Sequence, residues 1–415
     1  MASTQFSFSS AQEAVDPRGV IKNAVESGKT LPSSWYSDED IFQREQRTIF
    51  RRAWEYVGHK GRVGRAGDYF TCEVGGVPLV IVCGNDNKVR AFHNICRHRH
   101  HPVANGSGNQ GLLICNYHAW TYELDGSLRA APRSRENPSF DKSQQCLKQA
   151  SVAFLGDMVF VNPMEDAPSL STALGPIEQL VQTRKFPMET ARFRARRSIE
   201  FNANWKIVWD NNCECYHCPT VHPAWYRSSR LDPKHMYTYP VGPLQIEGTL
   251  DLQEGSPPDY VFFAWPTICF MSSGGQGALP ETVIANEPGT GASSKDLLPG
   301  FVAYRIHALG VRQTRIEFDV YTVNDLTEEQ ADEWLQMIVK ILSEDREVCE
   351  GVQRGHDSGI ADMGTLLTAI DSEFMAQTWE RLVYRAVTDP DAGLYDPILE
   401  PSENGPANLL RSGAA

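Results

Sequence analysis

The stretch that decides the fold reads CRHRHHPVANGSGNQGLLICNYH and runs from Cys96 to His118. Cys96 and His98 open it, Cys115 and His118 close it, and sixteen residues separate His98 from Cys115. Two thiolates and two imidazoles in this order can hold a [2Fe–2S] cluster with both sulfurs on one iron and both nitrogens on the other, which is a Rieske centre. Neutral imidazoles reduce the negative charge around the irons, so such a cluster accepts an electron at a higher potential than an all-cysteine cluster.

A structural zinc site is the alternative, because two Cys and two His also satisfy tetrahedral Zn²⁺. Zinc sites usually draw their ligands as one pair of Cys and one pair of His. Here each short loop supplies one sulfur and one nitrogen. The pattern therefore favours the iron–sulfur cluster.

A second constellation lies in DNNCECYHCPTVHP, residues 210–223. Four residues separate His217 from His222, and with one carboxylate these histidines could form the facial triad of a non-haem Fe(II) enzyme. Three ligands on one face leave positions open for O₂ beside a substrate. The His pair alone is weak support for a metal site, but it gains weight after a Rieske motif.

Three cysteines surround this His pair, namely Cys213, Cys215 and Cys218. They could form a second zinc cluster with the histidines. Oxygen activation at Fe(II) is better served by imidazole and carboxylate ligands than by several thiolates. We therefore interpret the three cysteines as small buried hydrophobic residues.

The carboxylate must come from elsewhere, and the best candidate segment is 327–355. Thr327 to Gln330 (TEEQ) resembles a capping box that opens a helix. An apolar stripe at helical spacing follows, made of Leu335, Ile338, Val339 and Leu342. The helix then enters SEDREVCEGVQRG, residues 343–355, where an acidic run is usually a solvated face.

The stretch from His93 to Pro132, with CRHR, CNYHAWTY and LDGSL, resembles the Rieske domain of Rieske non-haem iron oxygenase α-subunits. This superfamily includes aromatic-ring-hydroxylating dioxygenases and quaternary-ammonium monooxygenases. The chain departs from the common pattern at Asn116 and Ala119, where Pro and Gly are usual, and in its His100-His101 pair. All four ligands remain in place.

The resemblance covers the chain apart from its termini and implies an α+β fold. An N-terminal all-β Rieske [2Fe–2S] domain would precede a C-terminal helix-grip catalytic domain with an antiparallel sheet. The boundaries expected are an N-terminal segment and helix at 1–60 that pack on the catalytic domain, the Rieske domain at 61–165, the catalytic domain at 166–400 and a tail at 401–415.

The resemblance also implies roles for the acidic residues. Asp345 matches the family's third iron ligand beside His217 and His222, and Glu344 is its competitor. Glu214 matches the acid that bridges an iron-ligand His to a Rieske-ligand His of the neighbouring subunit. Asp210, one helical turn earlier, is the alternative bridge.

Glu214 in ECYHC resembles homotrimeric members that oxidise quaternary ammonium compounds such as carnitine, stachydrine and glycine betaine. We therefore expect monooxygenation of such a compound, with aromatic ring hydroxylation as the alternative. A Rieske electron carrier is a more remote alternative, and it would hold two irons per chain instead of three. Six aromatic residues near the iron motif could form a cation–π cage, an apolar slot or ordinary core, namely Trp209, Tyr216, Trp225, Phe262, Phe263 and Trp265.

A separate NAD(P)H-dependent flavin/iron–sulfur reductase is implied as the electron donor, because no G-x-G-x-x-G follows a strand in this chain. The net charge of −13 and the absence of a basic patch argue against nucleic acid or an anionic membrane as a partner. Ten cysteines in 415 residues do not form a secreted disulfide framework, and no apolar run reaches the length of a membrane span. We expect a cytoplasmic enzyme.

Periodicity predicts the remaining elements. A helix is expected over Ser37–His59 and a helical linker over Leu170–Lys185. Gly-rich turns separate short β-runs, and β-branched and aromatic segments predict a larger antiparallel sheet. The strands expected are Tyr69–Val74, Pro78–Cys83, Val89–Asn94 and Phe193–Phe201, with further strands in 260–272 and 301–323. The Gly-, Ser- and Pro-rich stretch 272–300 is expected to be an insertion or an active-site lid.

Overall fold

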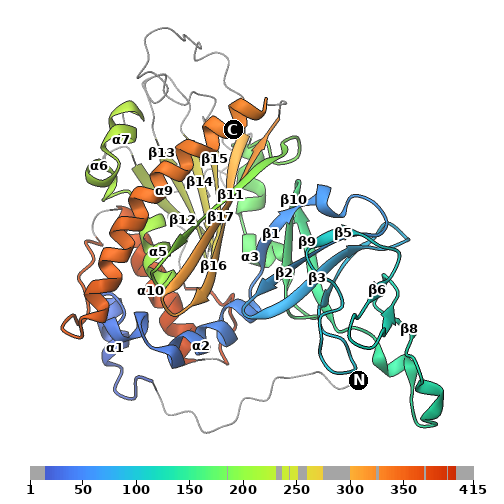
Figure 1. Cartoon of the computed structure of the whole chain (residues 1–415). Coiled ribbons are helices and arrows are strands. Elements are labelled where there is room, and N and C mark those ends of the chain that lie inside the picture. The colour runs from blue at the N-terminus through green and yellow to red at the C-terminus, as the bar shows by residue number, and fades with distance from the viewer. Residues whose placement is uncertain are drawn as a thin grey trace.

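Two seven-stranded antiparallel sheets lie side by side in the computed structural model (Figure 1). The structure describes residues 15–184, 186–229, 236–242, 244–250, 259–273, 300–323, 327–368, 371–389 and 391–398. Within these residues, no helix is long and apolar enough to cross a membrane.

The N-terminal sheet has the strand order β1-β10-β9-β4-β3-β2-β5, and a three-stranded sheet β6-β7-β8 extends from it. The strands are β1 Glu55–His59, β2 Asp68–Val74, β3 Val77–Cys83, β4 Val89–His93, β5 Ser107–Asn109, β6 Leu113–Ile114, β7 Thr121–Tyr122, β8 Leu128–Ala130, β9 Gln149–Leu155 and β10 Met158–Asn162. Gly75 and Gly76 form the β2–β3 turn with φ of 56° and 71°, as a two-residue hairpin turn requires. A Cβ at Gly75 would also lie 2.8 Å from the backbone nitrogen of Arg51.

The C-terminal sheet has the order β11-β17-β16-β15-β14-β13-β12. Its strands are β11 Arg192–Phe201, β12 Met236–Gly242, β13 Gln245–Leu250, β14 Asp259–Ala264, β15 Ile268–Ser273, β16 Gly300–Gly310 and β17 Gln313–Thr322. Side chains alternate across this sheet. Phe263 therefore packs in the core under the long helices, and its neighbour Phe262 packs in the core on the opposite face.

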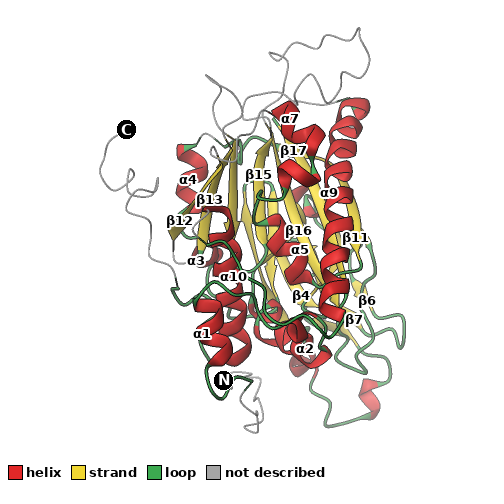
Figure 2. Ribbon diagram, turned by 90° about the vertical axis from the view of Figure 1, so that its left-hand side faces the viewer, coloured by secondary structure: helices red, strands yellow, loops and turns green. Residues whose placement is uncertain are grey.

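Helices cover both faces of the C-terminal sheet. Figure 2 shows α5, α9 and α10 running along one face. The α-helices are α1 Val20–Glu26, α2 Glu39–Thr48, α3 Leu170–Leu174, α4 Ile177–Thr183, α5 Trp205–Asn212, α6 Cys218–Val221, α7 Pro223–Ser229, α9 Glu328–Asp357 and α10 Asp371–Thr388. The 3₁₀ turns of the described residues are η1 Ser33–Tyr36, η2 Phe50–Arg52, η3 Lys60–Val63, η4 Ser134–Glu136 and η5 Lys142–Gln145.

The predicted helix over Ser37–His59 was wrong in its second half. Asp38 caps α2 by accepting hydrogen bonds from the backbone of Asp40 and Ile41, and the helix ends at Thr48. Residues 55–59 instead form β1, which pairs with β10. Edge pairing in the sheet outweighed the helical spacing of the apolar residues.

The other expected elements are present with small changes. The predicted strands appear as β2, β3, β4, β11 and β14 to β17, and the predicted long helix begins at Glu328 as α9. The helical linker divides into α3 and α4 at Gly175-Pro176, because Pro176 cannot continue a helix. The stretch 272–300 lies outside the described residues from 274 to 299. Among the described elements, the sequence did not predict β5 to β10, β12, β13, α1 or α10. The N-terminal sheet spans 55–162, and the predicted domain boundaries remain a prediction.

Candidate metal centres

The first centre lies in two loops, one after β4 and one after β6. Each loop closes on itself through backbone hydrogen bonds: His100 N donates to Cys96 O at 3.0 Å, and Ala119 N donates to Cys115 O at 2.9 Å. His100 and Ala119 adopt left-handed φ of 63° and 54°. This conformation costs about 1–2 kcal/mol for a residue with a Cβ. It explains why Gly is the usual residue at the position of Ala119.

The four expected ligands converge at the tips of these loops. Cys96 and Cys115 are buried with their sulfurs in contact. His98 is exposed and His118 is half-buried, and their ring centroids lie 4.7 Å apart. The sulfur side of the site is thus buried in the protein, and the imidazole side is near the surface.

The surroundings fit a cluster with two sulfur and two nitrogen ligands. His118 Nδ1 is buried and has no hydrogen-bond partner among the described residues, while Arg99 contacts the other ring nitrogen at 2.7 Å. Burial and then Arg99 lower the pKa of His118, which favours the neutral ring that a metal needs. The Tyr122 hydroxyl lies 3.3 Å from Cys96 Sγ and accepts a hydrogen bond from Arg97 N at 2.9 Å.

The second centre lies where α6 approaches α9. His217 and His222 flank α6, and Asp345 projects from α9. Asp345 Oδ1 lies 3.3 Å from His217 Nε2 and 2.9 Å from His222 Nε2. Oδ1 is buried and has no partner of good hydrogen-bond geometry within the described part of the chain. Three donor atoms that face one another in this way fit the facial triad expected for Fe(II).

A carboxylate supports each histidine ring from behind. Glu214 Oε1 lies 2.6 Å from His217 Nδ1, and Glu344 Oε2 lies 2.8 Å from His222 Nδ1. Such partners fix the ring orientation and increase the basicity of a ligating imidazole. Glu344, the expected competitor of Asp345, thus contacts the rear of His222, and Asp345 faces both ligand nitrogens.

The charges at this centre suit a cation. Burial alone would raise the pKa of Asp345, but His217 and His222 outweigh it and hold that pKa below its usual range. Burial would lower the pKa of His217, but Asp345 and Glu214 raise it to about 9. The two carboxylates thus stabilise positive charge at His217, and a bound cation would supply such a charge.

Cys215 and Cys218 correct one expectation, because they form a disulfide and are not simply buried hydrophobic residues. The tight turn brings their Cα atoms to 4.8 Å, a separation that suits a disulfide. Cys213 is free and buried. Cys218 Sγ lies near both His217 and His222, but as part of a disulfide it offers no thiolate to a metal.

Asp210 lies elsewhere than expected for an alternative bridge. Its side chain hydrogen-bonds Glu380 of α10, and the only carboxylate on His217 Nδ1 within the described residues is Glu214. The sequence reading also missed Asn211, whose Nδ2 lies 3.4 Å from His217 Nε2. Asn211 follows Asp210 in the sequence, but no sequence pattern predicts its contact with His217.

The six candidate aromatic residues lie in different surroundings, and Phe263 packs against Trp209. Trp225 lies 6.2 Å from the His222 ring, centroid to centroid, and Tyr216 is 55% exposed. Trp209 and Trp265 are fully buried against Trp379, and Phe262 faces the opposite core.

Two family models match the chain: the Rieske [2Fe-2S] domain over residues 53–146 and the catalytic domain of the ring hydroxylating alpha subunit over residues 188–266. With the relative described next, these matches show that the chain belongs to the Rieske non-haem iron oxygenase α-subunits, as expected. It is an oxidoreductase whose cofactors are a Rieske [2Fe–2S] cluster and a mononuclear iron.

Among its relatives is the carnitine monooxygenase oxygenase subunit of Acinetobacter pittii, which is 31% identical over 82% of this chain and 88% of the relative. The glycine betaine monooxygenase oxygenase subunit of Chromohalobacter salexigens is 35% identical over 47% of this chain and 43% of the relative. The crystal structure of the quaternary ammonium Rieske monooxygenase CntA with L-carnitine matches with a TM-score of 0.74 and 27% identity, over 90% of this chain and 99% of that chain.

Proposed function

We propose that this chain is the terminal oxygenase of a two-component system and that it hydroxylates an N-methyl or neighbouring carbon of a quaternary ammonium compound. The similarity to carnitine monooxygenase oxygenase subunits over most of both chains carries this proposal. A separate NAD(P)H-dependent reductase would deliver two electrons, one at a time. With O₂ and two protons, these electrons convert R–H to R–OH and water.

The residues of the iron centre would divide the work as follows. His217, His222 and Asp345 would hold the iron on one face, and the iron supplies the O₂ chemistry at its open positions. Glu214 and Glu344 would keep the two rings oriented through their Nδ1 atoms. Hydroxylation of an N-methyl group yields an N-hydroxymethyl product, which breaks down to formaldehyde and the demethylated amine.

The electron path would cross between subunits. In Figure 1, β6 leads into Cys115 at one side of the molecule, and α6, which His217 and His222 flank, lies at the opposite side. Ile114 and Tyr117 are exposed beside the cluster loops, and Tyr216 and Val348 are exposed beside the iron centre. We infer that these two apolar surfaces meet in a homotrimer, where the cluster of one chain would serve the iron of its neighbour through Glu214. The cytoplasmic location remains a prediction. It rests on cluster thiols that must stay reduced, and the Cys215–Cys218 disulfide argues in the opposite direction.

The direct test is a substrate panel with a surrogate reductase. L-carnitine, γ-butyrobetaine, glycine betaine and choline would be compared with indole, benzoate and naphthalene, and O₂ uptake would be measured together with product. We expect product from at least one quaternary ammonium compound, in a one-to-one ratio to O₂. Coupled turnover with the aromatic compounds alone would contradict the proposed substrate class and leave the metal centres unchanged.

A further inference from the structure

Two carboxyl groups meet behind the iron centre. Asp210 on α5 and Glu380 on α10 hydrogen-bond through their side chains and line the same small cavity. Glu380 is 2% exposed, so its charge is poorly solvated. Two carboxylates in such contact cannot both be ionised, and the pair must share a proton.

The partners of Glu380 indicate which group holds that proton. The Tyr36 hydroxyl donates to Glu380 Oε1 at 2.5 Å, and Leu31 N donates to Oε2 at 3.0 Å. An acceptor of two donated hydrogen bonds is stabilised as the anion. Asp210 is therefore the proton donor of the pair.

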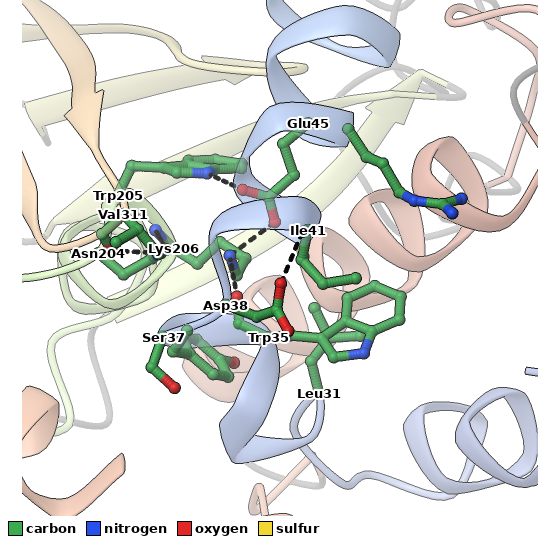
Figure 3. A network of polar contacts seen from close by, with 12 residues as sticks. Leu31, Trp35, Ser37, Asp38, Ile41, Glu45, Asn204, Trp205, Lys206 and Val311 are labelled. Atoms are coloured by element: carbon green, nitrogen blue, oxygen red, sulfur yellow. Dashed lines mark hydrogen bonds and ion pairs between the residues drawn. The ribbon is translucent and has the colours of Figure 1, made fainter. Parts of the chain in front are cut away.

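Lys206 is a cation close to this pair, and it is already hydrogen-bonded to other groups. Lys206 of α5 donates to Glu45 Oε1 of α2 at 2.6 Å and to the Trp35 carbonyl at 3.0 Å (Figure 3). Glu45 also accepts the Trp205 indole N–H at 2.7 Å. Lys206 and Glu45 thus form an ion pair, and Lys206 stabilises negative charge on Asp210 and Glu380 only through longer-range attraction.

The remaining titratable groups around Asp210 oppose a second negative charge. Burial and then Glu380 raise the pKa of Asp210 well above its usual range; Glu214 adds to this rise, and Lys206 opposes it without cancelling it. Burial raises the pKa of Glu380 to about 7. Cys349 of α9 also faces Asp210, and burial raises its pKa, so it is a neutral thiol.

The Asp210–Glu380 pair is connected to the iron ligands through the end of α5. The end of α5 leads directly into Glu214 and His217, and Cys213 N donates to the carbonyl of Asp210 at 3.2 Å. A shift of α5 away from α10 would therefore move the loop that orients the His217 ring.

We propose that Asp210 and Glu380 are positioning residues whose shared proton holds α5 against α10; we call this pair the clamp. The closed clamp fixes the positions of Glu214 and His217, and it opens when the shared proton dissociates. The effect on turnover rests on the proposed function, but the shared proton does not. Below the pKa of the pair the clamp is closed. As the pH rises through that pKa, the two anions repel each other and turnover falls, by about tenfold per pH unit for one essential proton.

Infrared spectroscopy of the full-length holoenzyme tests the proton directly. The C=O band of a buried protonated carboxyl group should be present at neutral pH, should disappear at alkaline pH, and should be absent from Asp210→Asn. Glu380→Gln should also remove the pair's titration and serves as the second variant if Asp210→Asn does not fold. Asp332→Asn is the matched control, because Asp332 is half exposed and paired with Arg197, and it should leave the band unchanged. A neutral-pH band of equal size in Asp210→Asn and the parent would overturn the shared proton.

The pH profile of kcat tests the positioning role. The amide of Asp210→Asn can donate to Glu380 but cannot ionise, so its ratio of alkaline to neutral kcat should exceed the parent's by about tenfold for each pH unit above the pKa of the pair. Parallel profiles for the two proteins would overturn the positioning role even if the infrared band behaves as expected. A confirmed band with no turnover on any substrate would count against the proposed function and not against the shared proton.

Discussion

Replacement of Glu214 by Gln should slow electron delivery and leave both metal centres filled. Glu214 Oε2 accepts the backbone N–H groups of Tyr216 and of His217, the latter at 3.2 Å, while Oε1 contacts His217 Nδ1 at 2.6 Å. Gln offers only one acceptor oxygen, so one of these two sides must lose its partner. A hydrogen bond to a charged group contributes about 1.5–3 kcal/mol, which corresponds to about 10- to 100-fold in rate.

The assay is a single turnover without reductase. The cluster is reduced in advance, substrate and O₂ are added, and the recovery of the oxidised-cluster absorbance is followed. We expect Glu214→Gln to keep three irons per chain and an unchanged cluster spectrum, and to reoxidise about 10- to 100-fold more slowly. Glu344→Gln is the matched control, because Glu344 supports His222 in the same way but is not on the proposed electron path. Its iron-loaded protein should reoxidise at the parental rate. Parental reoxidation in Glu214→Gln would refute the bridging role.

Three further predictions concern the ligands, the assembly and the fold. Cys96→Ala or His118→Ala should abolish the cluster absorbance and all reductase-driven turnover, whereas His217→Ala or Asp345→Ala should keep the spectrum and lose the third iron in metal analysis; normal turnover in Asp345→Ala would move the ligand role to Glu344. Mixed oligomers of Cys96→Ala and His217→Ala chains should recover part of the activity, and a verified hetero-oligomer without recovery would exclude transfer between subunits. Lys206→Met should lower the free energy of unfolding by about 3–5 kcal/mol, because it leaves Glu45 buried without its ion-pair partner; a loss below about 1 kcal/mol in denaturant titration would contradict this reading of the pair.

The Rieske motif was predictable because its ligands are local. Cys96 and His98 share one tight loop, Cys115 and His118 share another, and their spacing follows from cluster geometry. The strand before the Cys96 loop was also predictable, since Gly-rich turns separate runs of β-branched residues. The short strands β6 and β7, which flank the Cys115 loop, were not predicted.

The iron centre was less accessible to sequence reasoning. Asp345 approaches His217 and His222 only because α9 packs against α5 and α6. Asp345 and Glu344 are neighbours on one helix, and the rotation of α9 decides which of them faces the ring nitrogens. Core contacts of Leu335, Ile338 and Leu342 set that rotation, so sequence alone left the choice open.

The remaining errors also came from tertiary contacts. Residues 55–59 continue an apolar pattern that suits a helix. In the structure they instead form an edge strand that pairs with β10. The Cys215–Cys218 bond depends on how tightly the loop turns before α6. The link between Asp210 and Glu380 joins residues far apart in the sequence, and no local pattern marks it.

Single turnover with a quaternary ammonium compound tests the central claim most directly. Protein with a pre-reduced cluster and a filled iron site, free of reductase, would receive O₂ with L-carnitine or glycine betaine, and cluster oxidation and product would be measured together. The account predicts that the substrate accelerates cluster oxidation and that hydroxylated or demethylated product forms in the parent but not in His217→Ala. A rate of cluster oxidation that no quaternary ammonium compound changes would contradict it. Equal amounts of product from His217→Ala and the parent would also contradict it.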